Sequence, residues 1–286
     1  MERFDFSFTP SRGPARAECA RQGLEAVAVT NAGGYATPSG RSVALRTAVD
    51  RAVNGTVDYR EGSPVAAPFT AHRSTTRVRV VNGTSLASAR ELAARGPAPL
   101  VLNFASAKNP GGGFLNGARA QEESLARCSS LYACLLTSGM YAHHRANGDA
   151  MYTDWMIYSP DVPVFRDEDT AALLDEPYLC AFLTAPAPNA GVLLAREPSR
   201  RDDVDRVMTR RVGRALAIAA AHGHTRLVLG AWGCGVFAND PAVVARAFGA
   251  ELDGAFAGVF EEVVFAVLDW SEERRFIRPF VERFAS

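Results

Sequence analysis

Residues 100–128 read LVLNFASAKNPGGGFLNGARAQEESLARC, and this stretch combines a short apolar run, a glycine triplet and the beginning of a helix. The run Leu100–Phe104 predicts a buried strand, because it is short, apolar and followed by turn-forming residues. The triplet Gly111–Gly113 is entropically unfavourable in a folded chain, so it indicates positive φ angles or a close approach of the backbone to another group. We therefore expect a strand that leads into a tightly shaped loop.

Apolar residues at helical spacing follow the glycines. They are Leu125, Cys128, Leu131, Tyr132 and Leu135. This spacing predicts an amphipathic helix over Arg119–Leu136 and puts Glu122 and Glu123 in its first turns. Acidic residues near a helix N-terminus also complement the helix dipole, so this pair has a structural explanation besides a catalytic one.

A second glycine-rich loop occupies residues 230–239 and has the sequence GAWGCGVFAN. The run Arg226–Leu229 before it predicts a strand, and Asp240 and Pro241 after it are typical of a helix N-cap and first helical residue. A strand, a glycine-rich loop and a helix N-terminus together favour binding of a phosphate or diphosphate through backbone N–H groups. The glycine spacing matches neither the dinucleotide fingerprint nor the P-loop motif, which disfavours both of those sites.

Strand and helix patterns alternate along the rest of the chain, which predicts an α/β fold with helices on both faces of a parallel or mixed sheet. The other predicted strands are Arg77–Val81, Met151–Tyr158, Leu179–Leu183 and Val263–Leu268. The other predicted helices are Ser85–Ala94, Arg201–Ala221, Pro241–Phe256 and Glu272–Phe284. Ligands of such sheets bind beyond the carboxyl ends of the strands, where both glycine-rich loops are expected.

The first 75 residues lack this regular alternation. Their pattern predicts a helix at Arg16–Gly23, a strand at Ala26–Thr30, a turn, a strand at Ser42–Leu45 and a loop over Asp58–His72. No internal repeat and no low-complexity linker divides the chain. We therefore expect residues 1–75 to be an N-terminal extension packed on a catalytic core of residues 76–286, the two forming one structural unit.

Composition disfavours several classes of protein. Lys and Arg together number 31, as do Asp and Glu, so no net positive charge favours general nucleic-acid binding. Five cysteines without a C-x-x-C pair predict neither a disulfide framework nor a zinc site. No apolar stretch approaches the length of a membrane span or a signal sequence. We expect a cytoplasmic protein without a metal or a membrane partner.

The two loops carry a resemblance to a known family. The glycine triplet, a seven-residue spacer and Gln121-Glu122-Glu123 resemble the signature of the poly(ADP-ribose) glycohydrolases. The 230–239 loop is similar to the diphosphate loop of their bacterial-type branch, and Val80–Leu86 extends the resemblance. It implies a macrodomain-like three-layer α/β/α fold with a mixed central sheet. It also implies hydrolysis of the ribose–ribose bonds of poly(ADP-ribose), with release of ADP-ribose.

The resemblance implies a role for individual residues of the loops. Glu123 is expected to be the general acid on the glycosidic oxygen, Glu122 to hold a ribose hydroxyl, and Gln121 to support this pair. Phe237 is expected to pack against the terminal ribose. The glycines expected to approach the diphosphate and ribose are Gly111, Gly112 and Gly113. The backbone donors expected on the other side are Gly233, Cys234, Gly235 and Val236.

The remaining contacts with the ligand are expected on either side of these loops. Asn82–Ser85, including Thr84, follow the first core strand and are expected at the adenine end. Many macrodomains have an asparagine shortly after the strand that leads into the first loop, where this chain has Ala105-Ser106-Ala107. The ribose contact made there is therefore expected from Asn103 or Asn116.

A single carboxylic acid is expected to act twice. Neighbouring helical residues point about 100° apart, so Glu122 and Glu123 are poorly placed as acid and nucleophile on opposite faces of one sugar. We expect protonated Glu123 to protonate the leaving oxygen, the diphosphate to stabilise the oxocarbenium ion, and the resulting carboxylate to activate water. We expect no cofactor, a monomer, and ADP-ribosylated proteins as partners, without sequence-specific binding of nucleic acid.

Three other activities stay open. A non-hydrolytic macrodomain, which binds ADP-ribose as a reader of the modification, needs the same fold and the same phosphate-binding loop at residues 230–239, the anion loop. Such a protein gains nothing from two additional carboxylates. Removal of single ADP-ribose units from proteins is compatible with the same site. A third activity uses Cys234 as a nucleophile, although its apolar neighbours favour a packed thiol.

The histidines bear on the cysteine alternative. The candidate bases for Cys234 are His143, His144, His222 and His224. No spacing ties any of them to the cysteine. We expect His222 and His224 to be cations at the end of a helix, where they complement the helix dipole. We expect His143 and His144 on a solvated loop.

Overall fold

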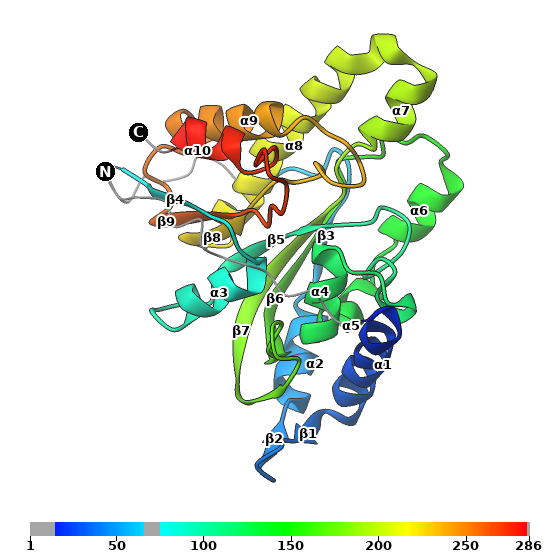
Figure 1. The fold of residues 1–286 in the computed structure, drawn as a ribbon, viewed down its shortest axis with the longest axis vertical. Helices are drawn as coiled ribbons and strands as arrows, with labels where there is room; N and C mark the ends of the chain where they lie inside the picture. The colour runs from blue at the N-terminus through cyan, green and yellow to red at the C-terminus, as the bar shows by residue number, and fades with distance from the viewer. Residues whose placement is uncertain (1–14, 66–74, 285–286) are drawn as a thin grey trace.

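A seven-stranded mixed sheet forms the centre of the computed structural model, which describes residues 15–65 and 75–284 (Figure 1). The strand order is β3-β6-β7-β5-β8-β9-β4. The strands are β3 (Val57–Tyr59), β4 (Arg77–Val81), β5 (Leu100–Phe104), β6 (Met156–Arg166), β7 (Leu173–Ala185), β8 (Arg226–Leu229) and β9 (Glu262–Ala266). Neighbours from β7 to β4 pair in parallel, whereas β6 is antiparallel to both β3 and β7. This is the mixed central sheet that the sequence predicts.

Helices cover both faces of this sheet (Figure 1). One face carries α8 (Arg201–Ala221), α9 (Pro241–Asp253) and α10 (Arg278–Phe284), and the other carries α3 (Ser85–Ala93), α4 (Gln121–Cys128) and α5 (Leu131–Leu135). Strand β5 shows how alternation produces the layers. Leu100 and Leu102 join the core beneath α8 and α9, whereas Val101 joins the core beneath α3 and α4. The predicted three-layer α/β/α fold is confirmed.

The N-terminal segment folds differently from the sequence prediction. A single helix, α1 (Arg16–Ala32), includes the predicted strand Ala26–Thr30, which is wrong. The apolar run could not reveal this, because its β-branched residues suit a strand. In the structure Cys19, Ala26 and Val29 recur at helical spacing on the buried face. The rest of the segment contains β1 (Gly34–Ala36), β2 (Ser42–Ala44), α2 (Arg46–Asn54) and β3. Strand β3 occupies the start of the predicted 58–72 loop, whose residues 66–72 lie outside the described residues.

The predicted helix over 119–136 is interrupted at Ser129. The Ser129 hydroxyl donates to the carbonyl of Leu125 at 2.7 Å, and its backbone pairs with Val164 of β6. The N–H of Ser130 donates to the carbonyl of Pro163. Pairing with a distant strand therefore ends α4, and α5 begins two residues later. A further helix, α6 (Met140–Ala146), follows and was not predicted.

The two long strands also differ from their predictions. The predicted strand over 151–158 begins at Met156 and continues to Arg166, past two prolines. Asp161 has a φ of 47°, and the register with β7 shifts between Ser159 and Val162, so a local irregularity accommodates Pro160, whereas Pro163 pairs in register with Leu179. Strand β7 extends well beyond the predicted 179–183, and the short helices α7 (Ala190–Arg196) and η2 (Pro198–Arg200) were missed. Strands β4, β5 and β8 and helix α8 match their predicted bounds.

His222 and His224 follow α8 but are not cations at its end. Burial lowers the pKa of both imidazoles, and that of His224 falls to about 4. The Nε2 atom of His222 lies 2.8 Å from the hydroxyl of Tyr59, and that of His224 lies 2.8 Å from the hydroxyl of Tyr158. Burial therefore disfavours the expected charge, most of all on His224, which is less exposed than His222.

None of the helices in the described part of the chain is both long and apolar enough to span a lipid bilayer.

Candidate active site

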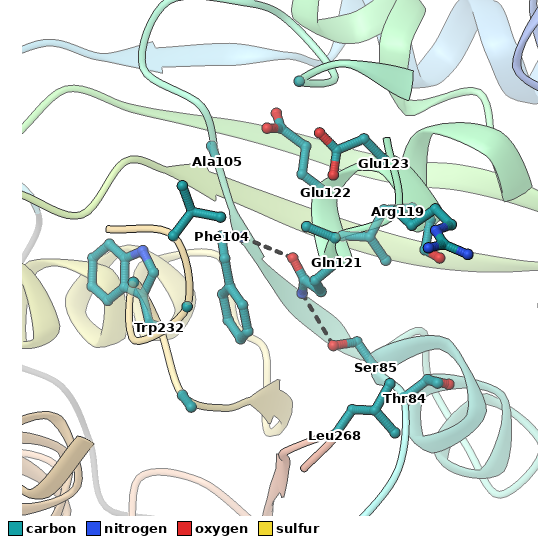
Figure 2. Close-up of a pocket in the computed structure, with 18 of the residues that line it drawn as sticks. Thr84, Ser85, Phe104, Ala105, Arg119, Gln121, Glu122, Glu123, Trp232 and Leu268 are labelled. Carbon is teal, nitrogen blue, oxygen red and sulfur yellow. Dashed lines mark hydrogen bonds between the residues drawn. The ribbon is translucent and has the colours of Figure 1, made fainter. Parts of the chain in front are cut away.

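The two glycine-rich loops follow β5 and β8, which are hydrogen-bonded neighbours in the sheet. Both loops therefore emerge at the same edge and face one cavity of about 510 Å³. Figure 2 shows Glu122 and Glu123 at one end of this cavity and Thr84 and Leu268 at the other. Its size suits a ligand of nucleotide dimensions.

Glu122 and Glu123 begin α4 and are both buried, being 4% and 8% exposed. One oxygen of Glu122 accepts a hydrogen bond from the N–H of Ser106 at 2.6 Å, and one oxygen of Glu123 accepts from the N–H of Gly113 at 2.9 Å. The second oxygen of each carboxyl group is buried without a hydrogen-bond partner in the described chain. Each glutamate thus combines a fixed orientation with one oxygen available for a ligand.

The environment of Glu122 favours its protonated form. Burial raises the pKa of this carboxyl group well above its usual range, and the adjacent Glu123 carboxyl raises it further. The hydrogen bond from the Ser106 N–H and the nearby Asn103 amide oppose the shift but do not cancel it.

The first loop needs glycine where it passes the glutamates. Gly111 and Gly112 have φ angles of 69° and 61°, as the sequence predicts. A Cβ atom on Gly112 would overlap the Glu123 carboxyl group and lie 3.0 Å from the nearer oxygen of Glu122. A side chain at this position would therefore displace the carboxyl pair.

Gln121 contacts the end of β5 and not the glutamate carboxyl groups. Its carbonyl accepts from the N–H of Phe104 at 2.9 Å, and its amide donates to the carbonyl of Leu102 and the hydroxyl of Ser85 (Figure 2). These contacts join β5, α4 and the beginning of α3. Gln121 thereby fixes the direction in which α4 presents the next two residues.

The second loop is held by two buried side chains. Trp232 donates from its indole N–H to the carbonyl of Ala185 at 2.9 Å, and the amide of Asn239 donates to the carbonyls of Pro188 and Gly233. Asp240 caps α9 by accepting from the N–H of Ala242, as predicted. The N–H groups of residues 235–237 have no acceptor within the described chain. Unpaired N–H groups next to a helix N-terminus suit an anion.

Cys234 is packed in this loop. Its thiol is buried and lies 3.7 Å from the carbonyl oxygen of Trp232. Burial raises the pKa of the Cys234 thiol, which disfavours the thiolate that a nucleophile requires. The geometry therefore argues against the cysteine alternative.

Most of the expected site residues line the cavity. These are Thr84, Gly112, Gly113, Gln121, Glu122, Glu123, Gly233, Cys234, Gly235, Val236 and Phe237. Asn103, Asn116, Gly111 and Asn82 are not on its wall. Asn103 is fully buried beneath Glu122, and its amide donates to Thr184, whereas Asn116 is exposed on η1 (Phe114–Asn116). Asn82 exchanges two hydrogen bonds with the backbone of Asp269.

Other lining residues escaped the sequence interpretation. They include Ser106, Asn109, Arg119, Glu168, Leu268 and Phe276. Asn109 and Arg119 belong to the first loop, but neither is part of the glycine triplet or of Gln121-Glu122-Glu123, so the motif does not predict their place on the cavity wall. Glu168 belongs to the loop that connects β6 and β7. The pairing of strands in the sheet places this loop beside the site, so a local sequence pattern cannot predict it. One Glu168 oxygen is buried without a partner in the described chain, and burial raises the pKa of this carboxyl group.

His143 and His144 lie on helix α6 and not on a solvated loop. His144 is buried and bonded through both ring nitrogens, to the carbonyl of Ala107 and to Thr153. Burial lowers the pKa of His144 to about 4. The sequence could not reveal this, because the helix is short and its buried face is set by distant residues.

A three-layer α/β/α fold with a buried carboxyl pair facing an anion loop defines a macrodomain-like glycosidase. The model of the microbial-type PARG catalytic domain matches residues 24–167. The poly(ADP-ribose) glycohydrolase (PARG) of Thermomonospora curvata is 46% identical, with a TM-score of 0.88 over 94% of this chain and 100% of that one. The chain therefore belongs to the microbial-type poly(ADP-ribose) glycohydrolase family, whose members hydrolyse poly(ADP-ribose).

Two further structures of relatives contain ligands. The Thermomonospora curvata enzyme bound to the inhibitor ADP-HPD is 46% identical, with a TM-score of 0.85 over 94% of this chain and 100% of that one. The enzyme of Deinococcus radiodurans in complex with ADP-ribose is 42% identical, with a TM-score of 0.74 over 84% of this chain and 98% of that one. No curated protein sequence matched the chain.

Proposed function

We propose that the cavity binds the terminal ADP-ribose unit of poly(ADP-ribose) and that Glu123 is the general acid and then the general base of its hydrolysis. Glu122 binds a hydroxyl group of the reacting ribose, and the N–H groups of Gly235 and Val236 bind the diphosphate. Phe237 packs against the ribose. Thr84 lies at the adenine end. The complex of the Deinococcus radiodurans relative with ADP-ribose supports this choice of ligand.

One observation carries the proposal. Glu122 and Glu123 each have a buried oxygen without a hydrogen-bond partner among the described residues, and both line the cavity that the 230–239 loop faces. Leaving a buried carboxylate oxygen unsatisfied costs about 1–3 kcal/mol, so the arrangement is unfavourable unless a ligand supplies donors. Ribose hydroxyl groups supply such donors, and the glycosidic oxygen supplies an acceptor for the proton of the general acid.

The chemistry balances with one acid. Glu123 gives its proton to the oxygen that links two riboses, and the bond from the terminal ribose carbon to that oxygen breaks. The leaving ribose keeps the oxygen as a hydroxyl group, and the terminal ribose becomes an oxocarbenium ion next to the bound diphosphate. The Glu123 carboxylate then takes a proton from water as the water oxygen adds to the cation. The enzyme ends with Glu123 protonated, ready for another cycle.

Glu122 cannot serve as a nucleophile in the usual two-sided mechanism. Both carboxyl groups face Gly112, so they approach a bound sugar from one side. Retaining glycosidases need carboxyl groups on opposite faces of the sugar ring. A single acid and base assisted by the substrate diphosphate fits this geometry better.

We also propose that the protein acts as a monomer in the reducing cytoplasm and that its partners are poly(ADP-ribosyl)ated proteins. All five cysteines are free and buried, which suits a reducing compartment.

The test compares the wild type with Glu123→Gln, which retains an oxygen to accept from Gly113 but has no acidic proton. Purified proteins are incubated with poly(ADP-ribose) in the presence of EDTA, and released ADP-ribose is quantified. We expect the substitution to reduce kcat by at least about 100-fold, because general acid catalysis contributes roughly 10²–10⁴. The affinity for ADP-ribose, measured by calorimetry, is expected to change little.

Glu91→Gln is the matched control, because Glu91 is an exposed carboxylate of α3 that bonds Arg79 and Arg95 far from the cavity. This control is expected to cleave at the wild-type rate. A Glu123→Gln enzyme that keeps more than about a tenth of the wild-type kcat contradicts the assignment of the acid. Loss of wild-type turnover in EDTA contradicts a metal-free mechanism.

A further inference from the structure

Tyr152 has an unusual backbone conformation close to the site. Its φ angle is 56°, in the left-handed region that bulky side chains rarely adopt. Such a conformation persists only where the surrounding structure fixes it, and it is a reason to look for a role. Tyr152 belongs to the turn of residues 151–154, which connects α6 to β6.

A buried arginine holds this turn in place. Arg211 of α8 is 1% exposed, and its guanidinium donates to the carbonyls of Met151 at 2.8 Å and Tyr152 at 3.0 Å. It also donates to the carboxylate of Asp154 at 2.8 Å and to the carbonyl of Pro186 at 3.1 Å. Five donors in a rigid plane suit this task, which a lysine could not perform. The 151–154 turn is thereby fixed to α8 and to the segment after β7.

The Tyr152 ring reaches the second loop. Its centroid lies 6.0 Å from that of Phe237, with the planes tilted by 42°. This is a normal distance for a stabilising aromatic pair. The Phe237 side chain also packs against the hydrophobic core beneath α8 and α9, and its backbone carbonyl accepts from the N–H of Gly191 at 3.0 Å. Tyr152 is the aromatic side chain that packs on the Phe237 ring.

The same turn reaches the first loop through His144. The N–H of Thr153 donates to Nε2 of His144 at 3.1 Å, so Nε2 is the unprotonated nitrogen. The proton is then on Nδ1, which donates to the carbonyl of Ala107 at 3.2 Å. Ala107 directly follows Ser106, whose N–H orients Glu122. The Tyr152 ring also packs against His144, with centroids 5.5 Å apart.

We infer that Tyr152 and His144 are positioning residues that join the two glycine-rich loops, with the 151–154 turn as a rigid brace between Phe237 and Ala107. The brace keeps the ring of Phe237 at a fixed distance from the carboxyl pair. It therefore sets how the reacting ribose is presented to Glu123. This role rests on the proposed function of Glu123 and Phe237. A displacement of about 1 Å between reacting groups reduces catalysis by up to about 100-fold, so the side chains need not touch the substrate to matter.

The test is a double-substitution cycle with Tyr152→Leu and Phe237→Leu, in which ADP-ribose release and ADP-ribose binding are both measured. We expect Tyr152→Leu to reduce kcat at least about tenfold while the dissociation constant for ADP-ribose changes less than about threefold. Tyr152→Phe keeps the ring and is expected to restore wild-type kcat. In the Phe237→Leu background, Tyr152→Leu is expected to cause no further loss, because its effect passes through Phe237.

Tyr35→Leu controls for loss of a partly buried tyrosine. Its ring packs on Phe165 at the same centroid distance of 6.0 Å, but Phe165, unlike Phe237, is not on the cavity wall. This control is expected to lower the melting temperature as Tyr152→Leu does, and to retain wild-type kcat.

The outcomes separate the brace from the proposed function. A wild type that releases no ADP-ribose refutes the proposed hydrolysis itself. If Phe237→Leu lowers kcat and Tyr152→Leu does not, the brace is refuted and the proposed hydrolysis stands. Additive losses of kcat in the double variant refute the brace in the same way. His144→Phe adds an independent check, since it keeps a ring beside Tyr152 but removes both polar contacts. A wild-type kcat in this variant would remove His144 from the brace.

Discussion

Glu122 and Glu123 differ in what lies around them, although they are neighbours on one helix turn. Glu122 is oriented by the Ser106 N–H and lies above the buried amide of Asn103, and burial raises its pKa. Glu123 is oriented by the N–H of Gly113, the last residue of the glycine triplet. Two adjacent negative charges are unfavourable in a buried site, so the position of Glu123 beside Glu122 adds to the rise in the pKa of Glu122.

Gly235 offers a residue-scale test of the anion loop. A Cβ atom there meets no protein atom within 4 Å, and its N–H has no acceptor in the described chain. Gly235→Ala should therefore leave folding unchanged, because nothing in the protein opposes the methyl group. If the loop approaches a diphosphate closely, the methyl group enters that space, and we expect ADP-ribose affinity to fall at least about tenfold, or about 1.4 kcal/mol. Calorimetry and thermal melts measure both quantities.

Two glycine controls make that result interpretable. Gly148→Ala also meets no protein atom, lies outside the loop, and should change neither melting temperature nor affinity. Gly233→Ala should lower the melting temperature, because its Cβ would lie 2.5 Å from Ala187 and its φ of 74° disfavours a side chain. Unchanged affinity in Gly235→Ala, with Gly148→Ala as reference, argues against a diphosphate at this loop.

At the scale of elements, the cluster of Tyr59, Tyr158, His222 and His224 joins the end of α8 to β3 and β6. Tyr158 and His222 are stacked with centroids 3.6 Å apart, and both histidines bond a tyrosine hydroxyl. This cluster lies outside the cavity wall, so its effect is on stability. It links an edge strand contributed by the N-terminal segment to the main sheet.

The cluster predicts a pH-dependent stability. Burial lowers the pKa of His224 from 6.5 to about 4, so between these values the unfolded chain binds more protons than the folded chain. Stability should therefore fall as the pH decreases through this window. We expect His224→Phe to reduce the loss in melting temperature between pH 7 and pH 5 by about 3 °C or more relative to the wild type. The exposed His143→Gln should retain the wild-type loss, and an unchanged loss in His224→Phe would exclude His224 as its source.

The elements differ in how far the sequence determines them. Strands β5 and β8 and helix α8 were predicted with their observed bounds, because each combines a strong local pattern with clear turn residues. The second half of α1 was not, because the run Ala26–Thr30 suits a strand and only packing against distant residues selects the helix. Local patterns likewise could not reveal α7, a short helix of seven residues.

The site shows the same division between local and distant determinants. The glutamate pair and the loop glycines were found because their motifs are contiguous in sequence. Asn103 and Asn116 were considered for a ribose contact, but neither lies on the cavity wall, whereas Asn109 does. Glu168 and Phe276 come to the wall from other parts of the chain through sheet order. Sequence motifs therefore do not predict the contacts that depend on the order of strands in the sheet.

For the whole molecule, the N-terminal segment packs closely against the rest of the chain. Helix α1 packs on η1 and α4, and Arg16 donates to the carbonyl of Asn116 at 2.9 Å. Phe165 of β6 is fully buried in a cluster with Ala26, Val29 and Val49. The segment thereby supports the back of the loop that carries the glycine triplet. A boundary at residue 75 stays a prediction, and its test is a truncation.

We expect a chain that begins at Thr76 to fail as an enzyme, although it retains the glutamate pair and both loops. Removal of residues 1–75 uncovers Phe165 and the edge of β6 that otherwise pairs with β3. An exposed strand edge promotes aggregation. ADP-ribose release by residues 76–286 alone should fall at least about 100-fold. Co-expression with residues 1–75 should restore soluble, active protein, because the two pieces share one core. If residues 76–286 alone cleave poly(ADP-ribose) at the wild-type rate, the N-terminal segment is a dispensable addition and the support of the glycine loop by α1 has no catalytic consequence.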